Sequence, residues 1–233
     1  MLKIKNGSMK KFSVTMVFVL ILFLTTALVI QENEREQLST NSQQEYIDGV
    51  QIDNHEWMTQ NLRVKEFRNG DPIKQVGSKD EWRKALENKE PAWCYLDFDP
   101  EKGEKYGKLY NQYAVLDPRG LAPEGWRLPT REDWKDLASF LEDKFDGRTG
   151  NLRNNTGLWK QSEIEPSFSA VPGGNYSNSW GFANEGSRIF WWAKTENDDG
   201  SPFLSHTELH RNGSLKVINH DNNDGLYVRC IKD

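Results

Sequence analysis

Residues 125–134 constrain the fold more than any other stretch, because they join an extended segment to the start of a helix. Pro129 disfavours helical geometry at Leu128. Thr130 is a good N-cap, and Asp133, three residues later, resembles the acidic partner of a capping box. Apolar side chains then recur at helical spacing: Trp134, Leu137, Ala138 and Leu141. The pattern predicts a helix over 130–144.

Two other parts of the chain also carry helix signals. Ser78 and Glu81 form a capping box just before Trp82, so a short helix is expected there. Aromatic and apolar residues at i, i+3, i+4, i+7 and i+8 predict an amphipathic helix over 106–115, whose stripe is most simply core packing. This stripe consists of Tyr106, Leu109, Tyr110, Tyr113 and Ala114.

Turn signals elsewhere predict short antiparallel strands. A hairpin is expected around Asp53-Asn54, and Asn212-Gly213 is a strong hairpin turn between two apolar runs. A strand is expected over 189–193 and a final one over 226–231. A hairpin, two main helices, and then loops with short strands make an α+β order without βαβ alternation. Nine Trp, seven Tyr and eleven Phe are enough to build a sizeable core.

The N-terminal region indicates a compartment. Residues 12–30 are almost wholly apolar and follow Lys10 and Lys11, which predicts an apolar helix that is a signal peptide or an uncleaved signal anchor. Residues 31–45 form a polar tether, and the domain occupies 46–233. The protein is therefore expected to be extracytoplasmic, either secreted or anchored at the cell surface, with the membrane as a partner if the leader is retained.

The balance of charges argues against one class of partner. The formal net charge is −5, and four of the 30 basic residues lie in the leader. Nucleic-acid binding needs a basic footprint, so no nucleic-acid partner is expected.

Several short motifs are shared with one family of exported bacterial proteins. They include Trp57-Met58, Phe67-Arg68-Asn69-Gly70-Asp71-Pro72-Ile73, Pro91-Ala92-Trp93-Cys94-Tyr95, Tyr106-Gly107-Lys108-Leu109-Tyr110-Asn111, Gly120-Leu121-Ala122-Pro123, Gly125-Trp126, Pro172-Gly173-Gly174 and Val228-Arg229-Cys230. On these residues the chain resembles the Fibrobacter succinogenes major paralogous domain family over about 50–233.

A more distant resemblance bears on the fold. Arg127-Leu128-Pro129-Thr130 with Trp134 is similar to the helix-opening motif of the formylglycine-generating and sulfatase-modifying enzymes. Val228-Arg229-Cys230 resembles the last strand of those enzymes and of C-type lectin-like domains. The resemblance implies a C-type lectin-like fold, in which two main helices pack on a small twisted antiparallel sheet with long loops.

The cysteines argue against the oxidase activity of those enzymes. The resemblance would require two closely spaced cysteines, whereas this chain has only Cys94 and Cys230. An oxidising compartment would allow these two to form a disulfide. The alternative is two buried thiols that pack as small apolar groups.

Two clusters are candidate metal ligands. Asp97, Asp99 and Glu101 are alternate carboxylates of the kind that calcium prefers, although a solvated acidic turn is the simpler interpretation. His206, Glu208 and His210 would share one face of a strand and could bind zinc, the alternative being an exposed polar face. No cofactor is expected, with calcium as the one possible exception.

The aromatic residues of the second half suggest a ligand site. Tyr176, Trp180, Trp191 and Trp192 lie in a Gly- and Asn-rich setting that suits sugar stacking, with core packing as the alternative. The expected function is a non-enzymatic binding module at the cell surface, with a glycan or a surface protein as partner, acting through the loops between residues 168 and 224. The alternatives are a carbohydrate-active or metal-dependent hydrolase using loop carboxylates, and a structural surface protein.

Overall fold

The computed structural model describes residues 26, 30, 31, 48–145, 168–196, 202–210, 215–219 and 223–232. The chain divides into two units, Met1–Glu45 and Tyr46–Asp233, and the architecture below is that of the second. The apolar helix expected over 12–30 and the tether expected over 31–45 lie outside the described residues, except at Thr26, Ile30 and Gln31. Within the described ranges, no helix combines the length and apolar character needed to cross a membrane.

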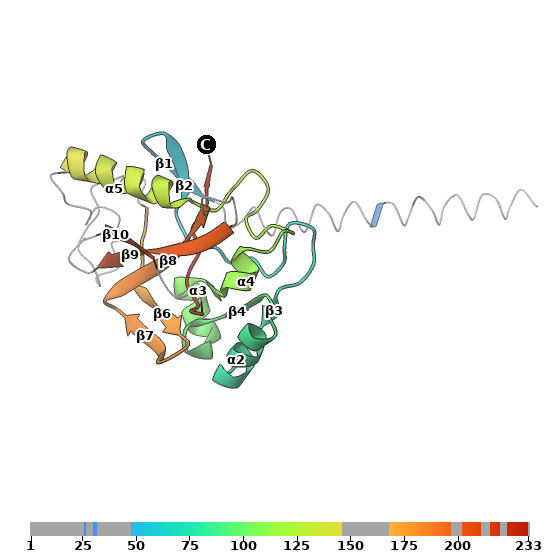
Figure 1. Ribbon diagram of the computed structural model, residues 1–233. Coiled ribbons are helices and arrows are strands. Elements are labelled where there is room, and N and C mark those ends of the chain that lie inside the picture. Colours follow the sequence, from blue (N-terminus) through green and yellow to red (C-terminus); the bar gives the residue numbers. More distant parts are fainter. Residues whose placement is uncertain are drawn as a thin grey trace, which may run out of the picture. The chain divides into compact units, whose positions relative to one another are not determined.

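The two ends of the second unit meet in one small sheet. Strands β1 (Gly49–Ile52) and β2 (His55–Met58) form the predicted hairpin, with Asp53 at φ 52° in its turn. The C-terminal strand β11 (Ile231–Lys232) pairs antiparallel with β2, giving the order β1-β2-β11 (Figure 1). The first and last segments of the domain are therefore joined by backbone hydrogen bonds.

The predicted capping box opens helix α2 (Lys79–Glu87). The Ser78 side chain accepts a hydrogen bond from the Glu81 amide at 3.2 Å, and the Glu81 carboxylate accepts one from the Gly77 amide at 2.7 Å. Trp82, Ala85 and Leu86 are buried, as their helical spacing requires. This short helix is confirmed.

The helix expected over 106–115 is wrong. Instead, the segment after the 3₁₀ turn η1 (Leu96–Phe98) forms, in order, α3 (Pro100–Tyr106), β5 (Leu109–Tyr110) and α4 (Gln112–Val115). Gly107 ends α3 at φ 86°, which is a left-handed conformation that favours glycine. Beyond it, β5 pairs with β4 (Ala92–Cys94), which in turn pairs with β3 (Lys74–Gln75).

The longest of the described helices matches its prediction closely. Helix α5 (Arg131–Phe145) begins one residue after Thr130, and Trp134, Leu137 and Leu141 are buried along one face. It makes contacts with the strands of the largest sheet, and Figure 1 shows it running along that sheet. The helical spacing of its apolar side chains is what places this face on the sheet.

The largest sheet has five strands in the order β10-β9-β8-β6-β7. Its strands are β6 (Gly173–Ser177), β7 (Gly181–Glu185), β8 (Arg188–Glu196), β9 (Pro202–His210) and β10 (Leu215–Asn219). The predicted strand over 189–193 is confirmed within it, as are strands over the two apolar runs on either side of Asn212-Gly213, whose turn lies outside the described residues. The sheet is mixed, because β6 and β8 are parallel where Gly174 faces Ile189.

The final strand expected over 226–231 is mostly wrong. Only Ile231–Lys232 forms a ladder, whereas Leu226 bridges Tyr110 and Tyr227 bridges Trp191. The segment contacts a different strand at almost every residue, so it joins the sheets instead of extending one. The whole arrangement of helices and three sheets is an α+β fold.

Aromatic side chains form the centre of the core. Trp134 lies 4.7 Å from Trp57 and 5.2 Å from Trp191 between ring centroids, and the latter pair is stacked. Phe168 contacts all three of these rings. This cluster locks α5, β2 and β8 together and so fixes the surfaces that these elements carry.

Candidate functional site

A groove of about 740 Å³ lies beside the segment that leads from α4 into α5. We call it the Trp126 groove. Residues that line it include Arg68, Asp117, Trp126, Arg127, Glu132 and Lys194. They come from three separate stretches of sequence, so the groove exists only in the folded domain.

Arg68 holds one wall of the groove in place. Its guanidinium donates to the Ala122 carbonyl at 2.9 and 3.2 Å and to the Trp126 carbonyl at 3.4 Å. The backbone amide of Arg68 also donates to the Gly120 carbonyl at 2.9 Å. The side chain remains about half exposed, at 46%, so it both fixes the 120–126 loop and faces solvent.

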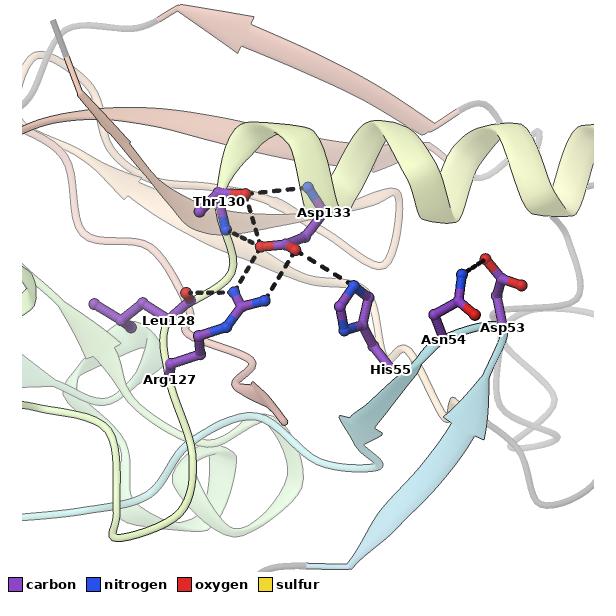
Figure 2. Close-up of polar contacts among 7 residues, drawn as sticks. All are labelled: Asp53, Asn54, His55, Arg127, Leu128, Thr130 and Asp133. Carbon is purple, nitrogen blue, oxygen red and sulfur yellow. Dashed lines mark hydrogen bonds and ion pairs between the residues drawn. The ribbon is translucent and has the colours of Figure 1, made fainter. Parts of the chain in front are cut away.

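A buried carboxylate holds Arg127 and Thr130, two further residues of the lining (Figure 2). Asp133 accepts hydrogen bonds from both terminal nitrogens of Arg127, at 2.7 and 3.1 Å, and from the Thr130 hydroxyl at 2.7 Å. The Asp133 amide donates back to the Thr130 hydroxyl at 3.1 Å, which is the predicted cap. His55 Nε2, from β2, lies 3.7 Å from the same carboxylate.

The Asp133 network keeps this carboxylate ionised. Burial on its own raises the pKa of Asp133, but the hydrogen bonds from Arg127 and Thr130 outweigh it and lower the pKa. The Arg127 backbone is held as well, by reciprocal hydrogen bonds with Ile231 at 2.9 and 3.0 Å. This part of the groove wall is therefore held by hydrogen bonds to both its side chains and its backbone.

The remaining charges of the groove differ in how far they are engaged. Asp117 accepts from Arg119 at 2.8 and 2.9 Å, which lowers its pKa, and Glu132 pairs with Lys135 at 2.6 Å. Among the described residues, the ammonium group of Lys194 has no hydrogen-bond or ion-pair partner. Lys194 is thus the least engaged cation of the lining, because Arg68 lies 3.8 Å from Glu124 and Arg127 pairs with Asp133.

The structure corrects the expected aromatic platform. Tyr176, Trp191 and Trp192 are buried, and only Trp180 is exposed, at 86%. Strand β8 is central and covered on both faces, so its neighbours Trp191 and Trp192 enter different core clusters. Each indole nitrogen also has an internal acceptor, Asn61 Oδ1 for Trp191 and the Tyr110 carbonyl for Trp192, both at 2.8 Å.

In the structure, two of the three candidate calcium ligands make other contacts. The Asp97 carboxylate pairs with Lys102 at 2.5 Å, and Asp99 caps α3 by accepting from the Glu101 amide at 2.9 Å. Glu101 is exposed. Across the described ranges, no group of three or more His, Cys, Asp or Glu side chains is placed to hold a metal ion.

The two cysteines are not paired, contrary to the disulfide expectation. Cys94 and Cys230 are both free and buried. They belong to different core clusters, and burial raises the pKa of each thiol. The alternative reading, two thiols that pack as apolar groups, describes them.

The alternating residues of β9 form ion pairs instead of a zinc site. Glu208 accepts from Arg188 at 2.7 Å and lies 2.8 Å from His210 Nε2. His206 and Glu208 are buried, and the His206 ring lies 5.6 Å from that of Phe190. The simpler expectation of an exposed polar face is therefore wrong as well.

Sequence reasoning missed the Trp126 groove. It used Gly120–Trp126 and Arg127–Trp134 only as signs of family and fold. A signal was present, since loop motifs with Gly, Pro, Arg and Trp often shape binding surfaces, but the sequence does not reveal that Arg68 and Lys194 meet there.

The fold and groove define an α+β domain with a preformed surface site. Residues 50–232 match the family model of the Fibrobacter succinogenes major domain, so the chain belongs to that family. No curated protein and no solved structure matches the chain.

Proposed function

We propose that this protein is an exported, non-enzymatic surface module that binds a polar ligand in the Trp126 groove, and that the ligand is a carbohydrate. The observation that carries the proposal is a rigid groove of ligand size that presents hydrogen-bond donors. Its volume falls in the usual range for small-molecule sites, about 300–1,000 Å³. Because the Asp133 network fixes the wall in advance, little ordering entropy opposes binding.

The chemistry of the lining suits a ligand rich in hydroxyl groups. Arg68 and Lys194 supply donors, and the partly exposed Leu128 adds apolar surface. Sugars combine hydroxyl groups with apolar ring faces, so they need such a mixed lining. No bound metal is required for these contacts, although calcium remains a component of the test below.

The charged state of the groove favours binding over hydrolysis, which is the alternative function. A glycoside hydrolase uses a pair of carboxyl groups, one of which acts as an acid with a raised pKa. In the groove, Arg119 instead lowers the pKa of Asp117, and Glu132 forms an ion pair with Lys135. A structural surface protein with no ligand is the third candidate, and the groove is the feature that argues against it.

Export of the protein and a C-type lectin-like fold are part of the same proposal. The apolar run over 12–30 supports export, with the leader either cleaved or kept as an anchor. The C-type lectin-like assignment is supported by the extended segment at Arg127 leading into α5 and by short strands joined by long connections. Glycan and surface-protein partners, and no nucleic acid, fit the acidic domain.

A glycan array of the purified full-length chain, run with calcium and with a chelator, tests the proposal. Changing Lys194→Met should weaken binding of any retained glycan about tenfold, because one charge-assisted hydrogen bond is lost. Lys84→Met, at an exposed position on α2, is the matched control and should have no effect. Equal binding by both variants would reject the groove, and release of a shorter glycan would support the hydrolase instead.

A further inference from the structure

The tip of one hairpin carries an exposed indole. Strands β6 and β7 are joined by a turn over 178–180, and Trp180, the last residue of this turn, is 86% exposed. Strand β7 lies at the edge of the five-stranded sheet opposite β10 (Figure 1). Each of the other tryptophans that the structure describes is buried. The Trp180 side chain is therefore the exception, because it contributes little to the core.

The turn does not need a tryptophan for its own geometry. Gly181 follows it at φ +80°, a conformation that favours glycine. The Asn178 amide donates to Asp224 Oδ1 at 3.1 Å, and Tyr176 exchanges backbone hydrogen bonds with Gly225 at 3.0 and 2.8 Å. Glycine and asparagine are common turn residues, whereas the indole makes none of these contacts.

Aromatic contacts anchor the two strands below the tip. The Phe182 ring lies 4.9 Å from that of Tyr176 and 4.8 Å from that of Phe98, between centroids. The Tyr176 ring also lies 5.0 Å from that of Trp82. Because Phe98 belongs to η1 and Trp82 to α2, the hairpin is packed on both of these elements. Its tip is therefore presented by a well-packed base.

Polar groups lie next to the exposed indole. Asn178 and Ser179 precede it in the turn, and both are exposed. A β-carbon on Gly181 would lie 3.0 Å from Nζ of Lys79, so the ammonium group of this α2 residue lies against the residue after Trp180. An aromatic face with amide, hydroxyl and ammonium groups beside it offers both stacking and hydrogen bonds. An apolar protein partner or a membrane would instead need a wider apolar surface.

We propose that Trp180 stacks on a sugar ring of a polysaccharide, with Lys79 donating a hydrogen bond to an oxygen of the same chain. The C–H face of the ring covers the indole, and its hydroxyl groups take the place of water at Asn178 and Ser179. One stacked ring binds weakly, but a polysaccharide raises the apparent affinity by offering the same ring many times. The Trp180 site shares no residue with the lining of the Trp126 groove and does not rest on the function proposed there.

Native affinity electrophoresis of the purified full-length chain tests the inference, in gels with and without hydroxyethyl cellulose, xylan, glucomannan or polygalacturonate. At least one of these polysaccharides should retard the wild-type protein. Trp180→Ala should lower the apparent affinity about tenfold because stacking is lost, and Trp180→Phe should retain most of it. Lys79→Gln should lower it about threefold. Lys84→Gln, also exposed on α2, is the control and should leave it unchanged.

The exposure of Trp180 separates binding from folding. Urea denaturation should give Trp180→Ala the same midpoint as the wild-type protein, so that lost retardation reports on the ligand. The proposal is overturned if no polysaccharide retards the wild-type protein, or if Trp180→Ala is retarded equally. Binding to phosphatidylcholine vesicles that Trp180→Ala weakens, without retardation by any polysaccharide, would assign the indole to a membrane surface instead. The Trp126 groove is tested separately, by Lys194→Met.

Discussion

At the scale of single residues, Asp133 connects more of the molecule than any other carboxylate in the site. It caps α5, holds Arg127 in the groove wall and lies next to His55 on the N-terminal hairpin. Its oxygens are buried, so each partner replaces a hydrogen bond to water that folding removes. One side chain thus couples the start of a helix to the shape of the groove.

Replacing Asp133 by Asn should reveal this coupling as a loss of stability. We expect the free energy of unfolding at neutral pH to fall by about 2 kcal/mol, since a carboxylate with charged and neutral donors becomes a neutral amide. Urea denaturation measures this change. Asp136→Asn, at an exposed position on the same helix, is the control and should change stability by less than about 0.5 kcal/mol.

The same variant should also change the dependence of stability on pH. The folded pKa of Asp133 lies below its ordinary value of 3.8. Its contribution is therefore complete above that value and is lost as the pH falls through the folded pKa. The difference between the wild-type protein and Asp133→Asn should close in acid, and a constant difference down to about pH 2 would contradict this account.

At the scale of elements, N-cap residues predicted helices more reliably than the spacing of apolar residues did. Ser78 and Thr130 each start a helix where the sequence predicts one, because a cap specifies one end of a helix chemically. The stripe from Tyr106 to Ala114 also fits helical spacing. In the structure, however, Gly107 ends α3, and the rest of the stripe forms strand β5 and the short helix α4. Apolar side chains on either side of a turn can reach one core without a continuous helix.

The contribution of Gly107 to the stability of the fold can therefore be tested by substitution. A β-carbon there would lie 3.0 Å from Cβ of Asn61, and the residue has φ +86°. Gly70 has the same φ with nothing within 4 Å, so it isolates the backbone cost. We expect Gly70→Ala to lower the free energy of unfolding by about 1 kcal/mol and Gly107→Ala by about 2 kcal/mol or more.

Urea denaturation of both glycine variants measures the difference. The two sites share the same φ, so the pair compares a glycine that closely approaches Asn61 with one that has open space around it. Equal losses of unfolding free energy would show that the Asn61 side chain moves aside without cost. The positive φ of Gly107 would then account for the whole effect. If Gly107→Ala gained helicity without losing stability, the continuous helix predicted over 106–115 would be supported after all.

At the scale of the whole molecule, the sequence predicted the fold class but not the surface. The α+β order and the hairpins follow from local signals, whereas the Trp126 groove requires Arg68 to meet residues more than fifty positions away. The aromatic platform failed for a related reason. Only the arrangement of sheets shows that β8 is covered on both faces, so that Trp191 and Trp192 are both buried.

The two thiols report on the integrity of the folded molecule. Both cysteines are at 0% exposure, and burial raises the pKa of each thiol, so neither presents a reactive thiolate. A thiol reagent should therefore label neither cysteine in the native, unreduced protein and both of them in denaturant. Fewer than two thiols in unreduced, denatured protein would show that Cys94 and Cys230 pair after all.

The pairing of β11 with β2 bears on how the protein responds to mechanical load. Strands β1 and β11 flank β2 and run in the same direction, with Gly49 at the start of one and Lys232 at the end of the other. Tension applied between these two ends would slide the outer strands past β2 in shear. In this geometry the backbone hydrogen bonds share the force and must break together, whereas peeling would break them one at a time. The small sheet at the two ends of the domain therefore has the geometry of a shear clamp.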